Sequence, residues 1–316
     1  EATVSLTITS VNDAPVLASV SDISFDEDGS DSISLTANDV EDGDQSSLTF
    51  SITDGSDVTA SLTGSDITFS APTDYNGSEN FTITVTDSGG LSDSQILTVT
   101  IVPVNDAPIA TTTLYGVTSE GESVSIFLSA TDVDGDELTY TVSEQSSSGV
   151  VTISGSNATY EPDGDYYGSD SFTFTVSDGT LTDEATVSLT ITSVNDAPVL
   201  AAVSDVSFDE DGSDSISLTA SDVEDGDQSS LTFSITDGSD ITASLTGSDI
   251  IFEANNDDYN GSENFTITVT DSGGLTDSQI MLVTIDSVND APVAQTGLSG
   301  TTNEDESVSV LLSGAD

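Results

Sequence analysis

Residues 80–87 read NFTITVTD, and every second position in this stretch is apolar: Phe81, Ile83 and Val85 alternate with polar residues. Residues 171–178, SFTFTVSD, repeat the pattern. Such alternation predicts β-strands with one buried face. Clusters of Gly, Asn and Asp interrupt the pattern about every eight to twelve residues, and no helical period accompanies it. We therefore expect an all-β fold made of short antiparallel strands.

The pentapeptide VNDAP divides the chain into repeats. Its four aspartates are separated by 93, 90 and 94 residues, which is the size of a domain. Each interval contains about seven short strands, so we expect an elongated tandem array of seven-stranded antiparallel Greek-key β-sandwiches of the immunoglobulin type. Residues 1–17 recur unchanged at 184–200, which shows that the repeats alternate in type. The VNDAP aspartates are Asp13, Asp106, Asp196 and Asp290.

These intervals predict three complete repeats and two partial ones. Repeats A and C are near copies, whereas repeat B diverges from both. The partial repeats at either end are too short to bury a core alone, and we expect the chain to be a piece of a longer array. The predicted boundaries are 1–13 for the last strand of an upstream repeat, 14–106 for repeat A, 107–196 for repeat B, 197–290 for repeat C, and 291–316 for the start of a fourth repeat.

The composition excludes several classes of function. The chain has 58 acidic residues and no Lys, Arg or His, which gives a formal charge of −58. Such a charge repels phosphate backbones and anionic head groups, so we expect no nucleic-acid partner. The apolar runs are too short for membrane insertion in this segment. Without His, Lys and Cys the commonest bases and nucleophiles of enzymes are missing.

Some of the acidic residues keep a fixed spacing through all repeats. From the VNDAP proline to a Glu is 12 residues, as from Pro15 to Glu27, and Asp39 follows 12 residues later. An Asp before Tyr, such as Asp74, precedes another Asp by 13 residues, here Asp87. The other members of this set are Glu120, Asp132, Asp165, Asp178, Glu210, Asp222, Asp258, Asp271, Glu304 and Asp316.

Acids gathered at strand ends predict a bound cation. Carboxylates within about 4–6 Å of each other resist joint ionisation unless a positive charge lies between them. No side chain of this chain can supply that charge. Ca²⁺ can, because it accepts about six to eight oxygens in flexible geometry, whereas Mg²⁺ demands octahedral geometry and keeps its waters. Asp and Asn are also ordinary turn residues, so for isolated acids such as Asp31 a turn or surface role is the expectation.

The combined motifs resemble the cadherin-like tandem repeats of large bacterial surface proteins. Residues 130–140, ATDVDGDELTY, are similar to the cadherin A-x-D-x-D-x-G segment. Residues 165–179, DYYGSDSFTFTVSDG, are similar to the L-D-Y-E to A-x-D stretch, and VNDAP is similar to the cadherin linker. The resemblance covers essentially the whole chain. It implies one to three Ca²⁺ ions at each junction between repeats.

The resemblance also implies which residues hold these ions. Repeats A and C read DVEDGD where repeat B reads DVDGD, so the second acid of the D-x-D pair is Glu41 or Asp42 in repeat A, with the same choice in repeat C. The cadherin Glu after Asp-Tyr falls on Asn76, Tyr167 and Asn260. The implied ligands are Asn12, Asp13, Asp39, Glu41 and Asp87 at the upstream junction; Glu27, Asp74, Asn105, Asp106, Asp132, Asp134 and Asp178 between A and B; Glu120, Asp165, Asn195, Asp196, Asp222, Glu224 and Asp271 between B and C; and Glu210, Asp258, Asn289, Asp290 and Asp316 after C.

The expected function is structural: an extracellular, calcium-stiffened stalk or filament segment of a bacterial surface or matrix protein that supports adhesion. Its partners would be neighbouring repeats and other copies in a fibre. The alternative is a directly adhesive module that self-associates between fibres or binds a glycan or protein. Calcium-dependent aggregation of purified protein would favour that alternative. A carboxylate-pair glycosidase is a remote alternative, because active sites are seldom copied in every repeat. We expect no enzymatic activity.

Overall fold

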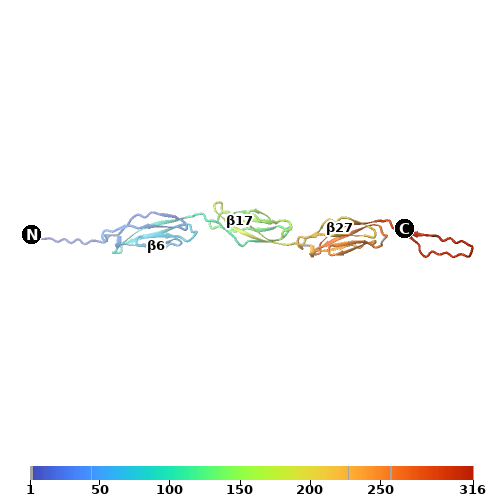
Figure 1. Ribbon diagram of the computed structural model, residues 1–316. Coiled ribbons are helices and arrows are strands. Elements are labelled where there is room, and N and C mark those ends of the chain that lie inside the picture. The colour runs from blue at the N-terminus through green and yellow to red at the C-terminus, as the bar shows by residue number, and fades with distance from the viewer. Residues whose placement is uncertain (1–2, 44, 227, 257, 316) are drawn as a thin grey trace. The chain divides into compact units, whose positions relative to one another are not determined.

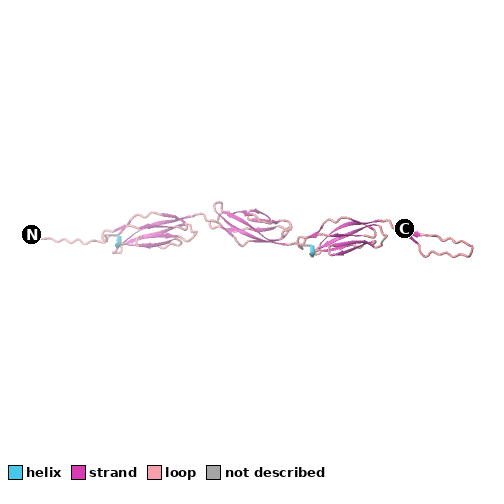
Figure 2. Cartoon of the chain, viewed as in Figure 1, coloured by secondary structure: helices cyan, strands magenta, loops and turns pink. Residues whose placement is uncertain are grey.

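The computed structural model describes residues 3–43, 45–226, 228–256 and 258–315. Strands dominate the described chain, and helical structure is limited to single turns (Figure 2). The fold class predicted from the alternation is therefore confirmed as all-β. The chain divides into two compact units; unit 1 is 1–116, 125–160 and 171–188, and unit 2 is 117–124, 161–170 and 189–316. No helix among the described residues is long and apolar enough to cross a membrane.

Repeat A folds into a β-sandwich. One sheet has the strand order β2-β9-β8-β5 and the other β3-β7-β6, while β1 pairs with β4. Nine strands are assigned among the described residues of repeat A where about seven are expected, because β1 and β4 form a two-stranded sheet beside the two larger sheets. The elements are β1 (Val16–Leu17), β2 (Ile23–Asp26), β3 (Ser30–Ser34), β4 (Ala37–Asn38), the single 3₁₀ turn η1 (Gln45–Ser47), β5 (Thr49–Ile52), β6 (Thr59–Thr63), β7 (Asp66–Ser70), β8 (Gly77–Thr86) and β9 (Ser92–Val102).

The alternating residues fill the space between the two sheets. Phe81, Ile83 and Val85 on β8 are fully buried. Phe69 on β7 meets Phe81 edge-to-face, with ring centroids 5.2 Å apart. Edge-to-face packing places the positive ring edge on the negative ring face, which favours this arrangement over a stacked one. The period of two in the sequence therefore marks the core correctly.

One strand pair in each four-stranded sheet of repeats A and C is parallel, although the sequence analysis predicts antiparallel strands. In repeat A, β2 runs parallel to β9, with Ile23 opposite Val99 and Asp26 opposite Val102. Strands β20 and β27 of repeat C pair in the same way. The alternation of apolar residues reports which face is buried, and it is the same for both strand directions. The parallel pair places the residue that follows β2, Glu27, beside the end of β9.

Repeats B and C have the same strand order as repeat A. Figure 1 labels β17 in repeat B and β27 in repeat C. The elements of repeat B are β10 (Ile109–Ala110), β11 (Tyr115–Ser119), β12 (Val124–Phe127), β13 (Ala130–Thr131), β14 (Thr139–Glu144), β15 (Gly149–Ser154), β16 (Asn157–Pro162), β17 (Gly168–Ser177) and β18 (Thr182–Thr192). Those of repeat C are β19 (Val199–Leu200), β20 (Val206–Asp209), β21 (Ser213–Ser217), β22 (Ala220–Ser221), the single 3₁₀ turn η2 (Gln228–Ser230), β23 (Thr232–Ile235), β24 (Ile241–Thr246), β25 (Asp249–Ala254), β26 (Gly261–Thr270) and β27 (Thr276–Asp286).

The core positions are kept across repeats while the side chains change. Phe252 and Phe265 of repeat C pair with ring centroids 5.4 Å apart, as the corresponding rings do in repeat A. In repeat B a tyrosine, Tyr160, is fully buried at that level of the core. Its hydroxyl donates to the carbonyl of Ser148 at 3.1 Å, so the buried oxygen is paired. A buried polar group needs such a partner to avoid a desolvation penalty.

The two ends of the chain differ from the complete repeats. No strand is assigned between Thr3 and Pro15, and the large apolar side chains of this segment, Val4, Leu6, Ile8 and Val11, are exposed. Beyond repeat C, β28 (Val293–Ala294) pairs with β29 (Gly314–Ala315). This pair corresponds to the pairing of β1 with β4 at the start of repeat A. The repeat boundaries themselves stay a prediction.

Candidate metal centre

Acids from three parts of the sequence meet at the linker between repeats A and B. Glu27 follows β2, Asp106 lies in the linker, and Asp134 lies in the loop after β13. Each offers an oxygen within 4.8 Å of the others, and all three belong to unit 1. The parallel pairing of β2 with β9 brings Glu27 to the linker, because β9 runs directly into it. The motif resemblance predicts these three residues at one junction, and the structure brings them together.

In two acids of this group, one carboxylate oxygen accepts a hydrogen bond from a backbone amide. The amide of Val104 donates to Glu27 Oε1 at 2.5 Å, and the amide of Asp106 donates to Asp134 Oδ2 at 2.8 Å. Glu27 is only 6% exposed. Its second oxygen, Oε2, is buried and has no hydrogen-bond partner. The backbone therefore orients the carboxylates and leaves one buried oxygen of Glu27 unpaired.

The linker asparagine contacts a second predicted ligand. The side-chain amide of Asn105 donates to Asp178 Oδ2 at 2.8 Å and to the carbonyl of Asp106 at 3.1 Å. The other oxygen of Asp178 accepts from the amides of Thr180 and Leu181. The side-chain bond from Asn105, followed by these amides, lowers the pKa of Asp178 well below its usual range. Asp178 is thus held as a carboxylate.

Two further acids join this site, and the sequence analysis does not include either. Asp28 lies within reach of Asp74 and Asp106, and it accepts a bond from the amide of Asp74 at 3.3 Å. Asp136 groups with Asp132 and Asp134. Asp28 has no counterpart in repeat B, so a search for acids present in every repeat passes over it. Asp136 is the last acid of the DVDGD run, which the D-x-D comparison does not use.

The linker between repeats B and C carries a similar group in unit 2. Glu120, Asp196 and Glu224 offer oxygens within 4.8 Å of one another. The amide of Val194 donates to Glu120 Oε1, and the amide of Asp196 donates to Glu224 Oε2 at 3.0 Å. These bonds repeat those of Glu27 and Asp134. The geometry thus recurs although repeat C has Glu where repeat B has Asp.

Three other predicted ligands of this linker make hydrogen bonds beside the group. The side-chain amide of Asn195 donates to Asp271 Oδ2 at 2.7 Å. The pKa of Asp271 lies below its usual value. Burial acts to raise it, but the bonds from Asn195 and from the amides of Leu275, Gly274 and Gly273 together outweigh that effect. Asp222 accepts from the amide of Glu224 at 3.0 Å, which orders the loop.

The first linker, before repeat A, shows the same bonds on its downstream side. Asn12 donates to Asp87 Oδ2 at 2.8 Å, and the amide of Asp13 donates to Glu41 Oε2 at 3.1 Å. Asp39 accepts from the amide of Glu41 at 2.8 Å. Asp42, the other candidate for the second acid, instead accepts from Ser88. The structure therefore places Glu41, and not Asp42, against the linker.

The remaining predicted ligands are only partly assembled. Glu210 is 6% exposed and accepts from the amide of Val288 at 2.6 Å, as Glu27 does from Val104. The side-chain amide of Asn289 donates to the carbonyl of the adjacent Asp290 at 3.0 Å. Asp165 and Asp258 are exposed and join no group of three acids in the described chain. Asp316 lies outside the described residues.

The buried unpaired oxygens coincide with the predicted set. In the part of the chain that the structure describes, eight buried side-chain oxygens have no hydrogen-bond partner. Every one belongs to an acid selected by spacing or by the resemblance. They are Glu27 Oε2, Asp39 Oδ2, Asp106 Oδ2, Glu120 Oε2, Asp132 Oδ2, Glu210 Oε2, Asp222 Oδ2 and Glu224 Oε1.

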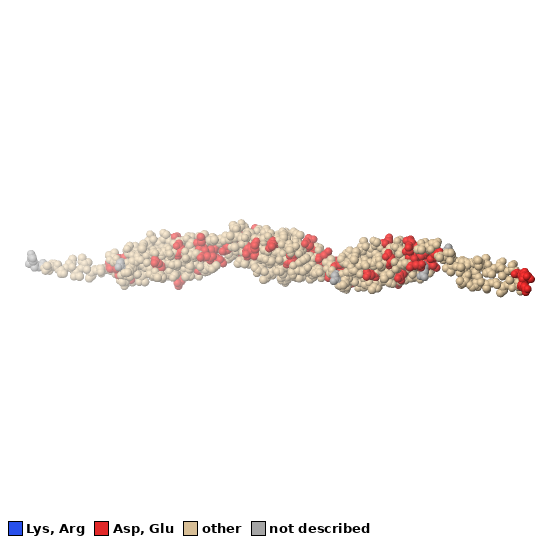
Figure 3. All heavy atoms as spheres, viewed as in Figure 1, with Lys and Arg blue, Asp and Glu red and all other residues tan. Residues whose placement is uncertain are grey.

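The electrostatics at the A–B linker favour a bound cation. Burial raises the pKa of Asp106, and the nearby charges of Asp74, Asp134, Glu27 and Asp28 raise it further. The chain has no Lys, Arg or His to offset these charges, and Asp and Glu are the charged residues coloured on the face that Figure 3 shows. A donor set of carboxylates, an asparagine amide and backbone carbonyls suits Ca²⁺. The residues present therefore fit a calcium ion.

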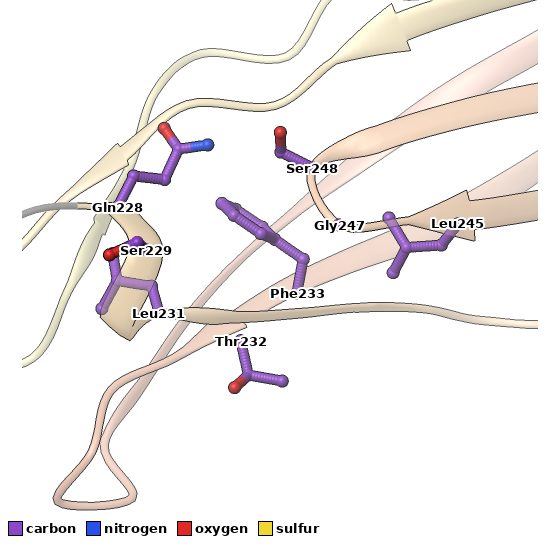
Figure 4. Close-up of a pocket in the computed structure, with 8 residues that line it drawn as sticks. All are labelled: Gln228, Ser229, Leu231, Thr232, Phe233, Leu245, Gly247 and Ser248. Carbon is purple, nitrogen blue, oxygen red and sulfur yellow. The ribbon is translucent and has the colours of Figure 1, made fainter.

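Two hollows on the surface differ in the ligands that they offer. A hollow of about 390 Å³ is lined by Asp74, Asp106 and Asp132 together with small and apolar residues. A wider one of about 590 Å³ opens at the edge of repeat C beside Phe233 and contains no acid (Figure 4). There, Gln228 Oε1 accepts a hydrogen bond from the amide of Ala220, and Gln228 Nε2 donates one to the carbonyl of Leu218. Of these two hollows, the first offers metal ligands.

The family of the chain follows from comparison with known sequences. A family model described as the bacterial Ig domain matches residues 12–100, 105–190 and 195–284. The chain therefore belongs to the bacterial Ig domain family, in three tandem copies. A search among curated proteins finds no match.

Solved structures with a similar fold are cadherin ectodomains. Protocadherin gamma B2 extracellular cadherin domains 1–5 has a TM-score of 0.59 at 18% identity, covering 96% of this chain and 67% of that one. Mouse cadherin-23 EC22–24 has a TM-score of 0.60 at 18% identity, covering 88% of this chain and 100% of that one. At such identities the likeness shows the fold alone. Together with the family match, it confirms the predicted resemblance to bacterial cadherin-like tandem repeats.

Proposed function

We propose that this chain binds calcium ions where its repeats meet, and that the ions hold neighbouring repeats together. It would thereby act as a structural segment of an extracellular bacterial surface or matrix protein that supports adhesion. The observation that carries the proposal is the set of buried, unpaired carboxylate oxygens. Leaving a buried charge without a partner is strongly destabilising. A cation from solution is the available partner, because the chain contains none.

Each proposed ion would take ligands from two repeats and from the linker between them. Glu27 comes from repeat A, Asp106 from the linker and Asp134 from repeat B, and Glu120, Asp196 and Glu224 follow the same rule one repeat later. An ion shared in this way favours one relative placement of two repeats over many. The supply of about six to eight oxygens would be completed by backbone carbonyls, Asn105 or Asn195, and water.

Thermal unfolding in calcium and in excess EGTA tests the proposal. A ligand present at 100 times its dissociation constant stabilises the native state by about 2.7 kcal/mol. For a domain of this size that corresponds to a melting temperature roughly 10–20 °C higher in calcium than in EGTA. Small-angle scattering should also change, because repeats without their shared ions sample more relative orientations. Mg²⁺ at the same concentration serves as the ionic-strength control.

A pair of variants locates the effect. Glu27→Gln keeps the shape of the side chain and an acceptor for Val104 but removes the charge, so it should reduce the response of the melting temperature to calcium. Asp31→Asn removes a charge at an exposed position of β3, outside every acid group found in the described residues, and should leave the response unchanged. Identical melting curves in calcium and EGTA would contradict the proposal. Direct adhesion and the expected lack of enzymatic activity stay predictions.

A further inference from the structure

The outer faces of the four-stranded sheets in repeats A and C carry no charge where their two central strands pair. These strands are β8 and β9 in repeat A and β26 and β27 in repeat C. Their outward residues alternate with the core-facing ones and have hydroxyl, amide or aliphatic side chains. We call these surfaces the neutral faces; they consist of Ser78, Asn80, Thr82, Thr84, Thr86, Ser92, Ser94, Ile96, Thr98 and Thr100 in repeat A, and of Ser262, Asn264, Thr266, Thr268, Thr270, Thr276, Ser278, Ile280, Leu282 and Thr284 in repeat C.

The acids of these sheets lie away from the neutral faces. Glu79 on β8 and Asp93 on β9 are in phase with the core-facing residues, and both accept hydrogen bonds from backbone amides. Outward acids lie on an edge strand or at the linker end of a strand, as Asp26 on β2 and Asp286 on β27 do. Charged residues make up 18% of the chain, and acids are usually exposed. A face of this size without an acid is therefore unusual for this protein.

An exposed isoleucine lies in the middle of each neutral face. Ile96 is 68% exposed and lies opposite Thr82 on the neighbouring strand. Ile280 is 70% exposed and lies opposite Thr266 in the same way. Removing such aliphatic side chains from water is favourable. Each neutral face thus combines hydrogen-bonding groups with an apolar centre that a partner could cover.

Repeat B offers an internal comparison, because its equivalent face is charged. Glu184 on β18 occupies the position at which repeats A and C have serine, and it accepts a hydrogen bond from the hydroxyl of Thr175 at 2.8 Å. Glu144 on the neighbouring β14 lies opposite Thr173. Thr186 replaces the exposed isoleucine. The neutral face is therefore a property of repeats A and C that the sandwich fold alone does not require.

A second copy of the chain is the partner that a neutral face fits. Hydroxyl groups both donate and accept hydrogen bonds, so a face of Ser and Thr is complementary to a copy of itself. Two chains that each have a charge of −58 repel each other, and like charges placed opposite each other across an interface are costly. The repulsion is smallest where neither surface has a carboxylate. A glycan fits less well, because the neutral faces contain no aromatic ring on which a sugar could stack.

We propose that the neutral faces of repeats A and C are self-association surfaces, through which copies of this chain bind each other sheet face to sheet face. Repeat B does not take part. A neutral face has fewer residues than the about 20–30 that each side of a standard interface contributes, so a single contact is weak. Each chain has two such faces and can bind two neighbours. The inference goes beyond the proposed function and does not depend on calcium at the linkers.

Sedimentation equilibrium of the full 316-residue chain tests this inference, in calcium and again in EGTA. The average mass of the wild-type chain should rise with concentration, and more steeply at high salt, because salt screens the repulsion between chains. Ile96→Glu combined with Ile280→Glu places a carboxylate in the middle of both neutral faces and should weaken association at least about tenfold. Thr186→Glu combined with Ser188→Glu adds the same charge to repeat B and should leave association unchanged.

The reverse exchange in repeat B protects the test against misfolded variants. Glu184→Ser combined with Thr186→Ile gives repeat B the side chains that repeat A has at these positions, and it should strengthen association. Far-UV circular dichroism checks the folding of every variant.

Three results would overturn the inference and leave the calcium proposal standing. The first is a wild-type chain that stays monomeric at every concentration. The second is equal weakening by the two pairs of added glutamates, because the effect would then come from net charge and not from a particular face. The third is association that disappears in EGTA and is the same in all variants, because ions and not the neutral faces would then join the chains. Conversely, melting curves that are identical in calcium and EGTA would leave this inference untouched.

Discussion

Residues 3–11 and 186–194 have the same sequence and different structures. In the second copy, β18 lies between β11 and β17, and Val187, Leu189 and Ile191 are at most 3% exposed. In the first copy the corresponding Leu6 is 82% exposed, and no strand is assigned from Thr3 to Pro15. Identical local propensity therefore produces a core strand only where neighbouring strands cover it. β-propensity behaves in this way because it mainly measures packing against neighbours.

The linkers that directly follow these two segments behave alike. Asn12 contacts Asp87 as Asn195 contacts Asp271, and the amides of Asp13 and Asp196 donate to Glu41 and Glu224. Their partners lie downstream, in repeats A and C, which are near copies. The comparison thus shows a boundary within one repeated stretch: upstream of the linker asparagine the structure depends on the preceding repeat, and from that asparagine onward it depends on the following one.

Hydrogen exchange should show the largest difference between the copies. Amides of the segment 3–9 should exchange at least about a thousandfold faster than those of 186–192, because opening β18 requires several kcal/mol. Peptic peptides from the two copies have equal masses and should give two separate isotope envelopes. Thr3→Ser shifts the mass of the first copy and assigns the envelopes. A single envelope would show that both copies are equally protected.

Truncation of the same leucine in each copy should have a smaller, measurable effect. Leu189→Ala removes a core side chain that is 2% exposed and should lower the free energy of unfolding of repeat B by about 2–5 kcal/mol. Leu6→Ala should change it by less than about 0.5 kcal/mol. Urea unfolding followed by tyrosine fluorescence measures this, because five of the seven tyrosines are in repeat B. Equal losses would mean that the first copy is also packed.

The smallest difference between the two copies concerns the linker asparagines, whose substitution should have the same effect in both. Asn12→Ala and Asn195→Ala each remove a bond to a carboxylate and should destabilise the local loop by about 1–3 kcal/mol. The exchange rates of the Leu91 and Leu275 amides report this, since both donate to the affected aspartates. The two variants should show similar increases. An effect at only one of the two positions would contradict the expectation that the two linkers are equivalent.

The candidate site is predictable where it follows from repetition. Glu27, Asp106 and Asp134 can be selected from the sequence alone, because their spacing or their resemblance to a known motif recurs. Asp28 cannot, because repeat B has Gly121 there and a periodic search discards unshared positions. Conversely, the fixed spacing of Asp165 and Asp258 does not bring them into an acid group within the described chain. Their role as ligands stays a prediction.

The sequence by itself determined the all-β class, the repeat length and the faces that are buried, because the pleat of a strand alternates with period two whatever the partner. It also determined that no side chain could neutralise the acids. Only the tertiary structure decided that β2 and β9 run parallel, that Asp28 meets Asp74 and Asp106, and that one of two identical segments is buried. These features depend on contacts between residues far apart in the chain, and no local pattern encodes such contacts.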